Sequence, residues 1–288
     1  MRMVIAIGGN ALFPKNSSGT AKEQRAAAKK AIGTLCRIFR NHQVVITHGN
    51  GPQIGSLLLQ QQSTEKVPRM PLAVLDAMTQ GEIGYFIESA LPENSAAIIT
   101  RVLVDDKDPA FRNPTKPIGP FYRKKFSKNM ISDAGRGYRL VVPSPKPKKI
   151  LEKNAITALM KQGFIVVCGG GGGIPVNSKG EGLDAVIDKD RFSSLLATTI
   201  KADALVFITS VDSVYTEFGK KSQKPIRKTD SKEMRRLLKQ GHFASGSMKP
   251  KIESALRFLE KGGKTVIICS IGNIGNAIRG KAGTFINV

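Results

Sequence analysis

Short apolar runs alternate with longer segments of helical periodicity along this chain. An apolar run without alternating polar residues is typical of a strand buried on both faces. Strands are predicted at residues 3–7, 44–47, 96–104, 164–168, 204–209, 264–269 and 284–286. Apolar residues at helical spacing predict helices at residues 21–39, 51–62, 71–91, 150–162, 188–200, 231–240 and 248–261. This order predicts an open three-layer α/β/α sandwich with a mainly parallel central sheet.

Three of the predicted strands end in glycine turns. Glycine lets the backbone turn sharply and lets an anion approach peptide N–H groups. One such turn alone is more often only a tight connection. Three turns on neighbouring parallel strands would form a cradle for phosphate or carboxylate oxygens at one edge of the sheet. The cradle is predicted at Gly8, Gly9, Asn10, Gly49, Asn50, Gly51, Gly170 and Gly171. Neither the P-loop nor the G-x-G-x-x-G fingerprint is present.

Residues 105–147 break the alternation of strand and helix. The segment is rich in Pro, Gly, Lys and Asp, and so long a stretch without a helical pattern is either a linker or a functional lid. Its aromatic residues and repeated prolines favour a rigid, ordered excursion. Between residues 71 and 91 the helix is broadly apolar, which is compatible with a protein–protein face, although core packing is the default interpretation.

Charge is the unusual feature of the composition. The 45 Lys and Arg against 22 Asp and Glu leave a formal net charge of +23. Such a charge suggests nucleic-acid binding, but the basic residues are spread along the chain and no known RNA- or DNA-binding pattern accompanies them. We therefore favour a solvated basic surface.

Cysteine, histidine and hydropathy patterns narrow the class of protein further. Cys36, Cys168 and Cys269 lie far apart and are interpreted as thiols in a reducing cytoplasm. The three histidines are equally scattered and indicate no metal cage. No apolar run is long enough to span a membrane, and no signal peptide is evident at Met1.

Lysines in structured contexts are candidates for phosphoryl transfer, which requires positive charge around the moving group. Lys116, Lys189 and Lys251 are the three candidates, although any single lysine in so basic a chain is more often a solvated surface residue. Asp188 is interpreted as a helix N-cap. Asp190, inside the first helical turn, is the better candidate to orient lysines or a magnesium ion.

Several segments of the sequence, in the same order along the chain, resemble segments of the carbamate kinases of the amino acid kinase superfamily. The most specific is Asn113-Pro-Thr-Lys-Pro-Ile-Gly-Pro-Phe-Tyr122, because that protruding subdomain distinguishes carbamate kinases from acetylglutamate, aspartate and uridylate kinases. The other matching segments are residues 5–12, 44–53, 108–111, 135–137, 141–145, 186–190 and 241–251, which run in order along the chain.

The resemblance implies a homodimeric enzyme that uses Mg-ATP and interconverts ATP plus carbamate with ADP plus carbamoyl phosphate. It implies that residues 1–173 form an N-terminal lobe that binds the small acid and makes the dimer, and that residues 174–288 form the nucleotide lobe. Lys116, Lys189 and Lys251 match lysines that contact the transferred phosphoryl group, and Asp190 matches the aspartate that organises them. Nucleotide contacts are implied at Thr209, Tyr215, Gly246 and Met248.

Three positions depart from the family pattern. Ser210 stands where an aspartate is usual, Lys249 where an uncharged residue is common, and Glu82 where a bulky apolar residue is usual in the long helix. Two alternatives remain open: another amino acid kinase that acts on a different small acid, and a basic non-catalytic relative that binds nucleic acid. The physiological direction of the reaction is not written in the sequence.

Overall fold

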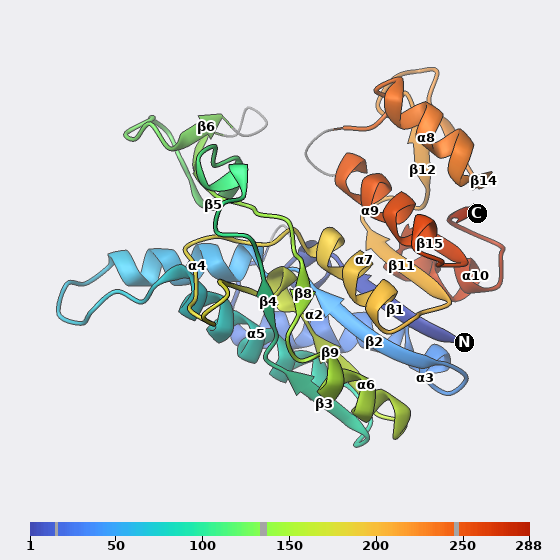
Figure 1. The fold of residues 1–288 in the computed structure, drawn as a ribbon, viewed down its shortest axis with the longest axis horizontal. Coiled ribbons are helices and arrows are strands. Elements are labelled where there is room, and N and C mark those ends of the chain that lie inside the picture. The colour runs from blue at the N-terminus through green and yellow to red at the C-terminus, as the bar shows by residue number, and fades with distance from the viewer. Residues whose placement is uncertain (15–16, 133–136, 245–247) are drawn as a thin grey trace.

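The computed structural model describes residues 1–14, 17–132, 137–244 and 248–288. Within this part of the chain, eight strands form a central sheet in the order β14-β16-β15-β11-β1-β2-β9-β3 (Figure 1). Neighbouring strands are parallel except for the antiparallel pair β15 and β16. The mainly parallel sheet is therefore confirmed. The strands are β1 (Arg2–Ile7), β2 (Gln43–His48), β3 (Ser95–Ile98), β9 (Ile165–Cys168), β11 (Ala204–Thr209), β14 (Lys228–Asp230), β15 (Thr265–Ser270) and β16 (Thr284–Asn287).

Helices cover both faces of the sheet because successive side chains of its strands point to opposite sides. In β1, Met3 and Ile5 join one buried cluster, which includes residues of α2 and α5, whereas Val4 joins another that includes residues of α6, α7 and α9. Two cores on one sheet make the predicted three-layer sandwich. The α-helices are α1 (Gly9–Leu12), α2 (Ala21–Gly33), α3 (Cys36–Phe39), α4 (Gly51–Gln62), α5 (Leu72–Glu88), α6 (Lys153–Lys161), α7 (Lys189–Thr199), α8 (Ser231–Lys239), α9 (Met248–Glu260) and α10 (Ile274–Ile278). The 3₁₀ turns are Pro109–Phe111, Gly170–Gly172 and Ile271–Asn273.

Two predicted elements are divided in the structure. The helix expected at residues 21–39 is α2 followed by α3, with the Thr34 hydroxyl donating to Ala31 O where α2 ends. The single strand expected at residues 96–104 is wrong. It is β3 followed by β4 (Arg101–Leu103), because the Gln80 side chain accepts from Thr100 N at 2.8 Å and donates to Thr100 O at 3.1 Å. That pair of bonds occupies the backbone of Thr100, and the chain leaves the central sheet there.

Three small sheets complete the described fold. β4 pairs with β8 (Lys149–Ile150) and with β10 (Ile174–Val176), and β12 (Val214–Thr216) pairs with β13 (Lys224–Ile226). Residues 174–183 contain β10 and one antiparallel bridge from Val176 to Gly182. No described helix has the length and apolar character that a membrane crossing requires.

The segment at 105–147 contains a third small sheet, formed by β5 (Lys116–Tyr122), β7 (Tyr138–Val142) and β6 (Met130–Ser132). It stands apart from the central sheet (Figure 1), as expected of an ordered excursion. Its base is anchored by apolar packing, since Ile118 and Val142 contact a buried cluster with Ile54 and Leu75 of α4 and α5. This anchor holds Lys116, the first residue of β5, close to the central sheet.

Candidate active site

A cleft of about 600 Å³ opens where the central strands end. β1, β2 and β9 are adjacent in the sheet, so the turns that follow them meet at one edge, as predicted. The cleft is lined by eight of the predicted glycine-turn and lysine residues, by Asn50, and by residues at the end of β11. These are Gly8, Gly9, Gly49, Asn50, Gly51, Gly171, Lys116, Lys189, Lys251, Thr209 and Ser210, with Asp188 and Asp190 among them.

The glycine turns are packed too closely to accept side chains. Gly171 has a φ of +68°, and a Cβ there would overlap the side-chain amide of Asn50. A Cβ on Gly49 would lie 3.1 Å from the backbone N of Gly9. Glycine at these positions brings the backbones of three turns together, which leaves their peptide groups near the cleft surface.

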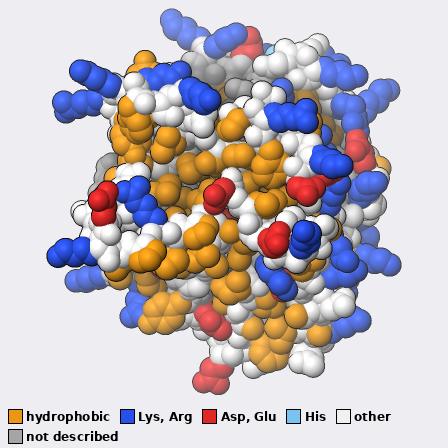
Figure 2. Space-filling model, turned by 60° about the vertical axis from the view of Figure 1, so that its left-hand side comes forward, with side chains coloured by type: hydrophobic (Ala, Val, Ile, Leu, Met, Phe, Trp, Pro, Cys, Tyr) orange, Lys and Arg blue, Asp and Glu red, His pale blue; other side chains and the backbone are white. Residues whose placement is uncertain are grey.

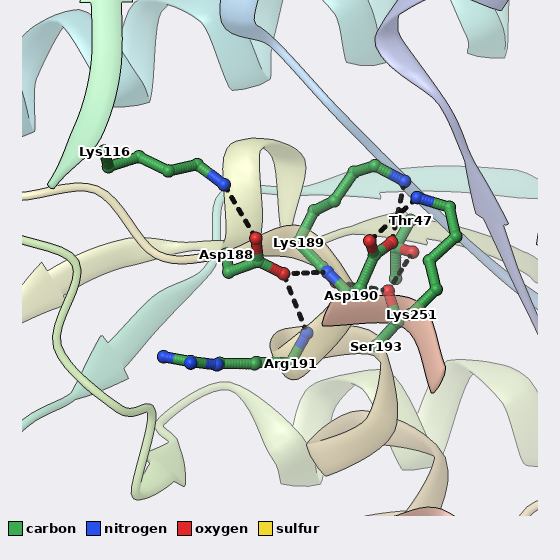
Figure 3. Close-up of polar contacts among 8 residues, drawn as sticks. All are labelled: Thr47, Lys116, Asp188, Lys189, Asp190, Arg191, Ser193 and Lys251. Atoms are coloured by element: carbon green, nitrogen blue, oxygen red, sulfur yellow. Dashed lines mark hydrogen bonds and ion pairs between the residues drawn. The ribbon is translucent and has the colours of Figure 1, made fainter. Parts of the chain in front are cut away.

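Three lysines and two aspartates form the charged floor of the cleft (Figure 3). Lys189 Nζ and Lys251 Nζ each lie 2.9 Å from one oxygen of the Asp190 carboxylate, and their side chains converge on it from α7 and α9. Lys116 Nζ reaches Asp188 Oδ2 at 2.7 Å from β5. Three ammonium groups facing two carboxylates leave one positive charge uncompensated, which favours an anionic ligand.

Local structure explains how α7 presents its lysine and aspartate. Asp188 Oδ1 accepts from the backbone N of Asp190 at 3.0 Å and of Arg191 at 3.3 Å, so it caps the helix as predicted. Ser193 Oγ donates to Lys189 O at 2.7 Å and contacts Thr47 Oγ1 at 2.7 Å, which ties this first turn to β2. The helix N-terminus therefore faces the cleft with its positive dipole end.

Asp188 has a second role that the sequence analysis missed, because it is also the ion-pair partner of Lys116. Burial alone would raise the pKa of Asp188, but the Lys116 ammonium, the backbone hydrogen bond from Arg191 and the charge of Lys189 outweigh it and lower the pKa to about 2. For Lys189, burial lowers the pKa, while Asp190 opposes the shift. No sequence signal joined Lys116 to Asp188, since 72 positions separate them.

His48 is not available as a base in this site. Its side chain is 1% exposed, and burial lowers its pKa to about 4. The ring packs against Gly170, where a Cβ would overlap it. Burial therefore keeps this imidazole neutral near pH 7.

The expected nucleotide residues are only partly gathered at the cleft. Thr209 lines it together with Ser210 and Ile271. Tyr215 instead packs near Phe218, with ring centroids 5.9 Å apart, and Met248 packs against the apolar core; neither is among the described residues that line the cleft. Gly170 is not among the described lining residues and packs against His48 and Gln80. Gly246, residues 135–136 of one matched segment and the side chain of Asn10 lie outside what the structure describes.

Among the described residues, no group of three or more His, Cys, Asp or Glu side chains could hold a metal ion. The acidic residues that line the cleft are Asp188 and Asp190, and both carboxylates already contact lysines. The described part of the site therefore contains no preformed protein cage for a cation.

Replacing Lys116 with Met should make the protein more sensitive to acid. The pKa of Asp188 lies below its unfolded value of about 3.9, so its stabilisation is present above that pH and is lost as the pH falls through about 2. Without the ammonium group, burial would dominate and the pKa would rise. We expect the acid-unfolding midpoint of Lys116→Met to move to higher pH, measured by melting temperature between pH 2 and pH 6. The exposed Lys124→Met on the same subdomain is the control; equal shifts in both variants would contradict the assignment.

Comparisons with known proteins show which family of proteins this chain resembles. The sequence profile of the Amino acid kinase family matches residues 1–270. A carbamate kinase of Trichomonas vaginalis is 44% identical over 99% of this chain and 98% of its own, and one of Thermococcus kodakarensis is 42% identical over 98% of both. The solved structure of a carbamate kinase from Giardia lamblia bound to AMP-PNP superposes with a TM-score of 0.92 at 39% identity, and the match covers 99% of this chain and 98% of that one.

Proposed function

Because the chain belongs to the amino acid kinase family, and within it to the carbamate kinases, we propose that its cleft carries out reversible phosphoryl transfer between ATP and carbamate, giving ADP and carbamoyl phosphate. The observation that carries this proposal is the convergence of Lys116, Lys189 and Lys251 beside a glycine-rich cradle at the end of the sheet. Such a site binds anions, and phosphoryl transfer depends mainly on positioning and on positive charge.

In the proposed mechanism a carbamate oxygen attacks the γ-phosphorus directly, in line with the leaving ADP. Carbamate is already an anion, so no base is required, which agrees with the enclosed His48. The ammonium groups of the three lysines stabilise the charge on the equatorial oxygens in the transition state. Asp190 keeps Lys189 and Lys251 in place through its two ion pairs. The peptide N–H groups near Gly9, Gly49 and Gly171 bind acid or phosphate oxygens.

The two reactants are proposed to bind on the two halves of the chain. Residues 1–173 hold the acid in the glycine cradle, and residues 174–288 hold the nucleotide. Thr209 at the cleft supports this division. Tyr215, Met248 and Gly246 remain predicted nucleotide contacts.

Magnesium is proposed to enter with the nucleotide. The lysine-bound carboxylates of the cleft offer no separate cage, and Mg²⁺ commonly keeps several waters and binds substrate phosphates with one or two carboxylates. When bound there, the ion would neutralise charge on the β- and γ-phosphates. Asp190, the carboxylate that the sequence predicted to orient lysines or a magnesium ion, already pairs through both oxygens with Lys189 and Lys251.

The proposed function is tested by ATP formation from ADP and carbamoyl phosphate, with and without Mg²⁺. We expect ATP to form only with the metal, and chelation with EDTA to abolish turnover. Acetylglutamate and aspartate, each supplied with ATP, form the control panel of other small acids, for which we expect no phosphorylation. Folded protein that makes no ATP from carbamoyl phosphate would refute the proposal.

A homodimer is proposed from the face that carries α4 and α5. Figure 2 shows that hydrophobic side chains gather across the middle of this face, with Lys and Arg mostly towards its margins. Val74, Met78 and Tyr85 of α5 are 41%, 45% and 55% exposed, and their spacing places them on one side of the helix. Exposed apolar residues at a shared helix face are typical of a subunit interface.

Met78→Asp should convert the dimer to a monomer. A charge at the centre of an apolar interface loses its hydration without gaining a partner, so association weakens. We expect light scattering to report the mass of two chains for the wild type and of one chain for the variant. Phe218→Asp, which changes an even more exposed apolar residue far along the chain, should stay dimeric. A wild type that is monomeric at all concentrations would remove the proposal.

We also propose a cytoplasmic location. All three cysteines are free, with Cys168 and Cys269 buried, which fits a reducing compartment.

A further inference from the structure

A carboxyl group lies buried directly behind the cleft, on α5. Asp76 is 1% exposed, and its Oδ1 accepts a hydrogen bond from Asn50 Nδ2 at 2.6 Å. Its Oδ2 has no partner among the described residues. The same Asn50 amide nitrogen donates to Thr79 Oγ1 at 2.9 Å, one helical turn further along α5. Both hydrogens of the Asn50 amide are thereby directed at α5.

This arrangement fixes which way the Asn50 amide faces. The Thr79 hydroxyl donates its single hydrogen to the backbone O of Asp76 at 2.9 Å, so towards Asn50 it can only accept. Asp76 Oδ1 is also an acceptor. Two acceptors on one side require the NH₂ group there, which turns the carbonyl Oδ1 of Asn50 the other way.

The other side of Asn50 belongs to the cleft. Asn50 is one of its lining residues, and its Oδ1 accepts no hydrogen bond from the described residues. Glycine at position 171 leaves room for the amide in this position, because a Cβ there would overlap it. Asn50 thus adds an unpaired hydrogen-bond acceptor to a cleft whose two described carboxylates, Asp188 and Asp190, already pair with lysines.

We propose that Asp76, together with Thr79, is a positioning residue that holds Asn50 so that its Oδ1 accepts an N–H from the amino group of the small acid. This inference rests on the proposed function and deepens it. N–H and ammonium groups alone would bind any small carboxylate or acyl phosphate. An oriented acceptor favours the acid that carries an amino group, since an acceptor left unpaired in a closed site costs binding energy.

The charge of Asp76 is not needed for this role. Burial raises the pKa of Asp76 to about 7, against the opposing hydrogen bond from Asn50. A proton on the unpartnered Oδ2 leaves Oδ1 free to accept from Asn50. An amide at position 76 also supplies an acceptor oxygen, whereas an apolar side chain supplies none.

The test compares carbamoyl phosphate with acetyl phosphate, which carries a methyl group in place of the amino group, as phosphoryl donors to ADP. We expect the wild type to prefer carbamoyl phosphate. Asp76→Leu should lower kcat/KM for carbamoyl phosphate about tenfold while leaving acetyl phosphate and the KM for ADP unchanged. Asp76→Asn should keep the wild-type ratio between the two donors. A merely structural defect would lower kcat/KM for both donors by a similar factor.

Thr79→Val provides a second, independent variant, because it removes one acceptor and keeps the volume. In this variant the ratio of kcat/KM for carbamoyl phosphate to kcat/KM for acetyl phosphate should fall by about threefold. A folded Asp76→Leu protein with the wild-type ratio would overturn the inference, and if that variant does not fold, an unchanged ratio in Thr79→Val would do so. Failure of the wild type to use carbamoyl phosphate at all would overturn the proposed function, and this inference with it.

Discussion

Lys251→Ala and Lys189→Ala should each lower kcat by about 10²-fold or more, because each would remove one preorganised cation from the proposed phosphoryl-transfer site. Lys251 is only 8% exposed and Lys189 is held at 2.9 Å from Asp190, so neither ammonium can be replaced by a mobile neighbour without rearrangement. The measurement is steady-state ATP formation from ADP and carbamoyl phosphate at saturating concentrations of both.

Lys249→Ala is the matched control for these variants. Lys249 lies on the same helix as Lys251, two residues away, but its side chain is exposed and outside the cleft. Its kcat should equal that of the wild type. The fold of each variant is checked by its melting temperature, which should change little because Asp190 keeps one lysine partner. Wild-type turnover in both Lys189→Ala and Lys251→Ala would refute the assignment of these lysines.

Asp190→Asn should damage both stability and turnover. The Asp190 carboxylate is 4% exposed and compensates two ammonium groups. Loss of one partner from a buried ion pair leaves charge uncompensated, and we expect the free energy of unfolding to fall by about 3 kcal/mol or more. Turnover should fall as well, since Lys189 and Lys251 would repel each other without the anion between them. Urea denaturation and steady-state kinetics measure the two effects.

Glu233→Gln is the control for the loss of an acidic charge. Glu233 pairs with Arg236 one turn along α8, where both side chains are exposed. An exposed pair contributes little to stability, so we expect no measurable change in denaturation or turnover. Asp190→Asn protein as stable as the wild type would show that the two lysines do not depend on this carboxylate.

Much of the fold follows from local pattern. The apolar run of β1 and the glycines after it predicted a central strand and a turn, and the same pattern recurs at β2 and β9. Asp188 was predicted as an N-cap from its place before an amphipathic segment, and its side chain accepts from Asp190 N and Arg191 N. These features depend on neighbours within a few residues, which is why sequence alone shows them.

The features that the sequence did not predict depend on residues that are far apart along the chain. The break between β3 and β4 requires the Gln80 side chain, which lies 20 residues from Thr100 in sequence. The reach of Lys116 to Asp188 spans 72 residues, and that of Lys251 to Asp190 spans 61. No periodicity marks such contacts.

The sequence by itself determined the layered α/β fold, the glycine turns and, through resemblance, the lysines and the reaction class. Burial pattern and backbone freedom are properties of short segments, so they can be predicted from the local sequence. Only the tertiary structure decided that Asp188 serves both a helix and a lysine, and that Asp76 and Thr79 orient Asn50. The direction in which a side chain presents its donors and acceptors is set by groups that folding brings together from separate elements.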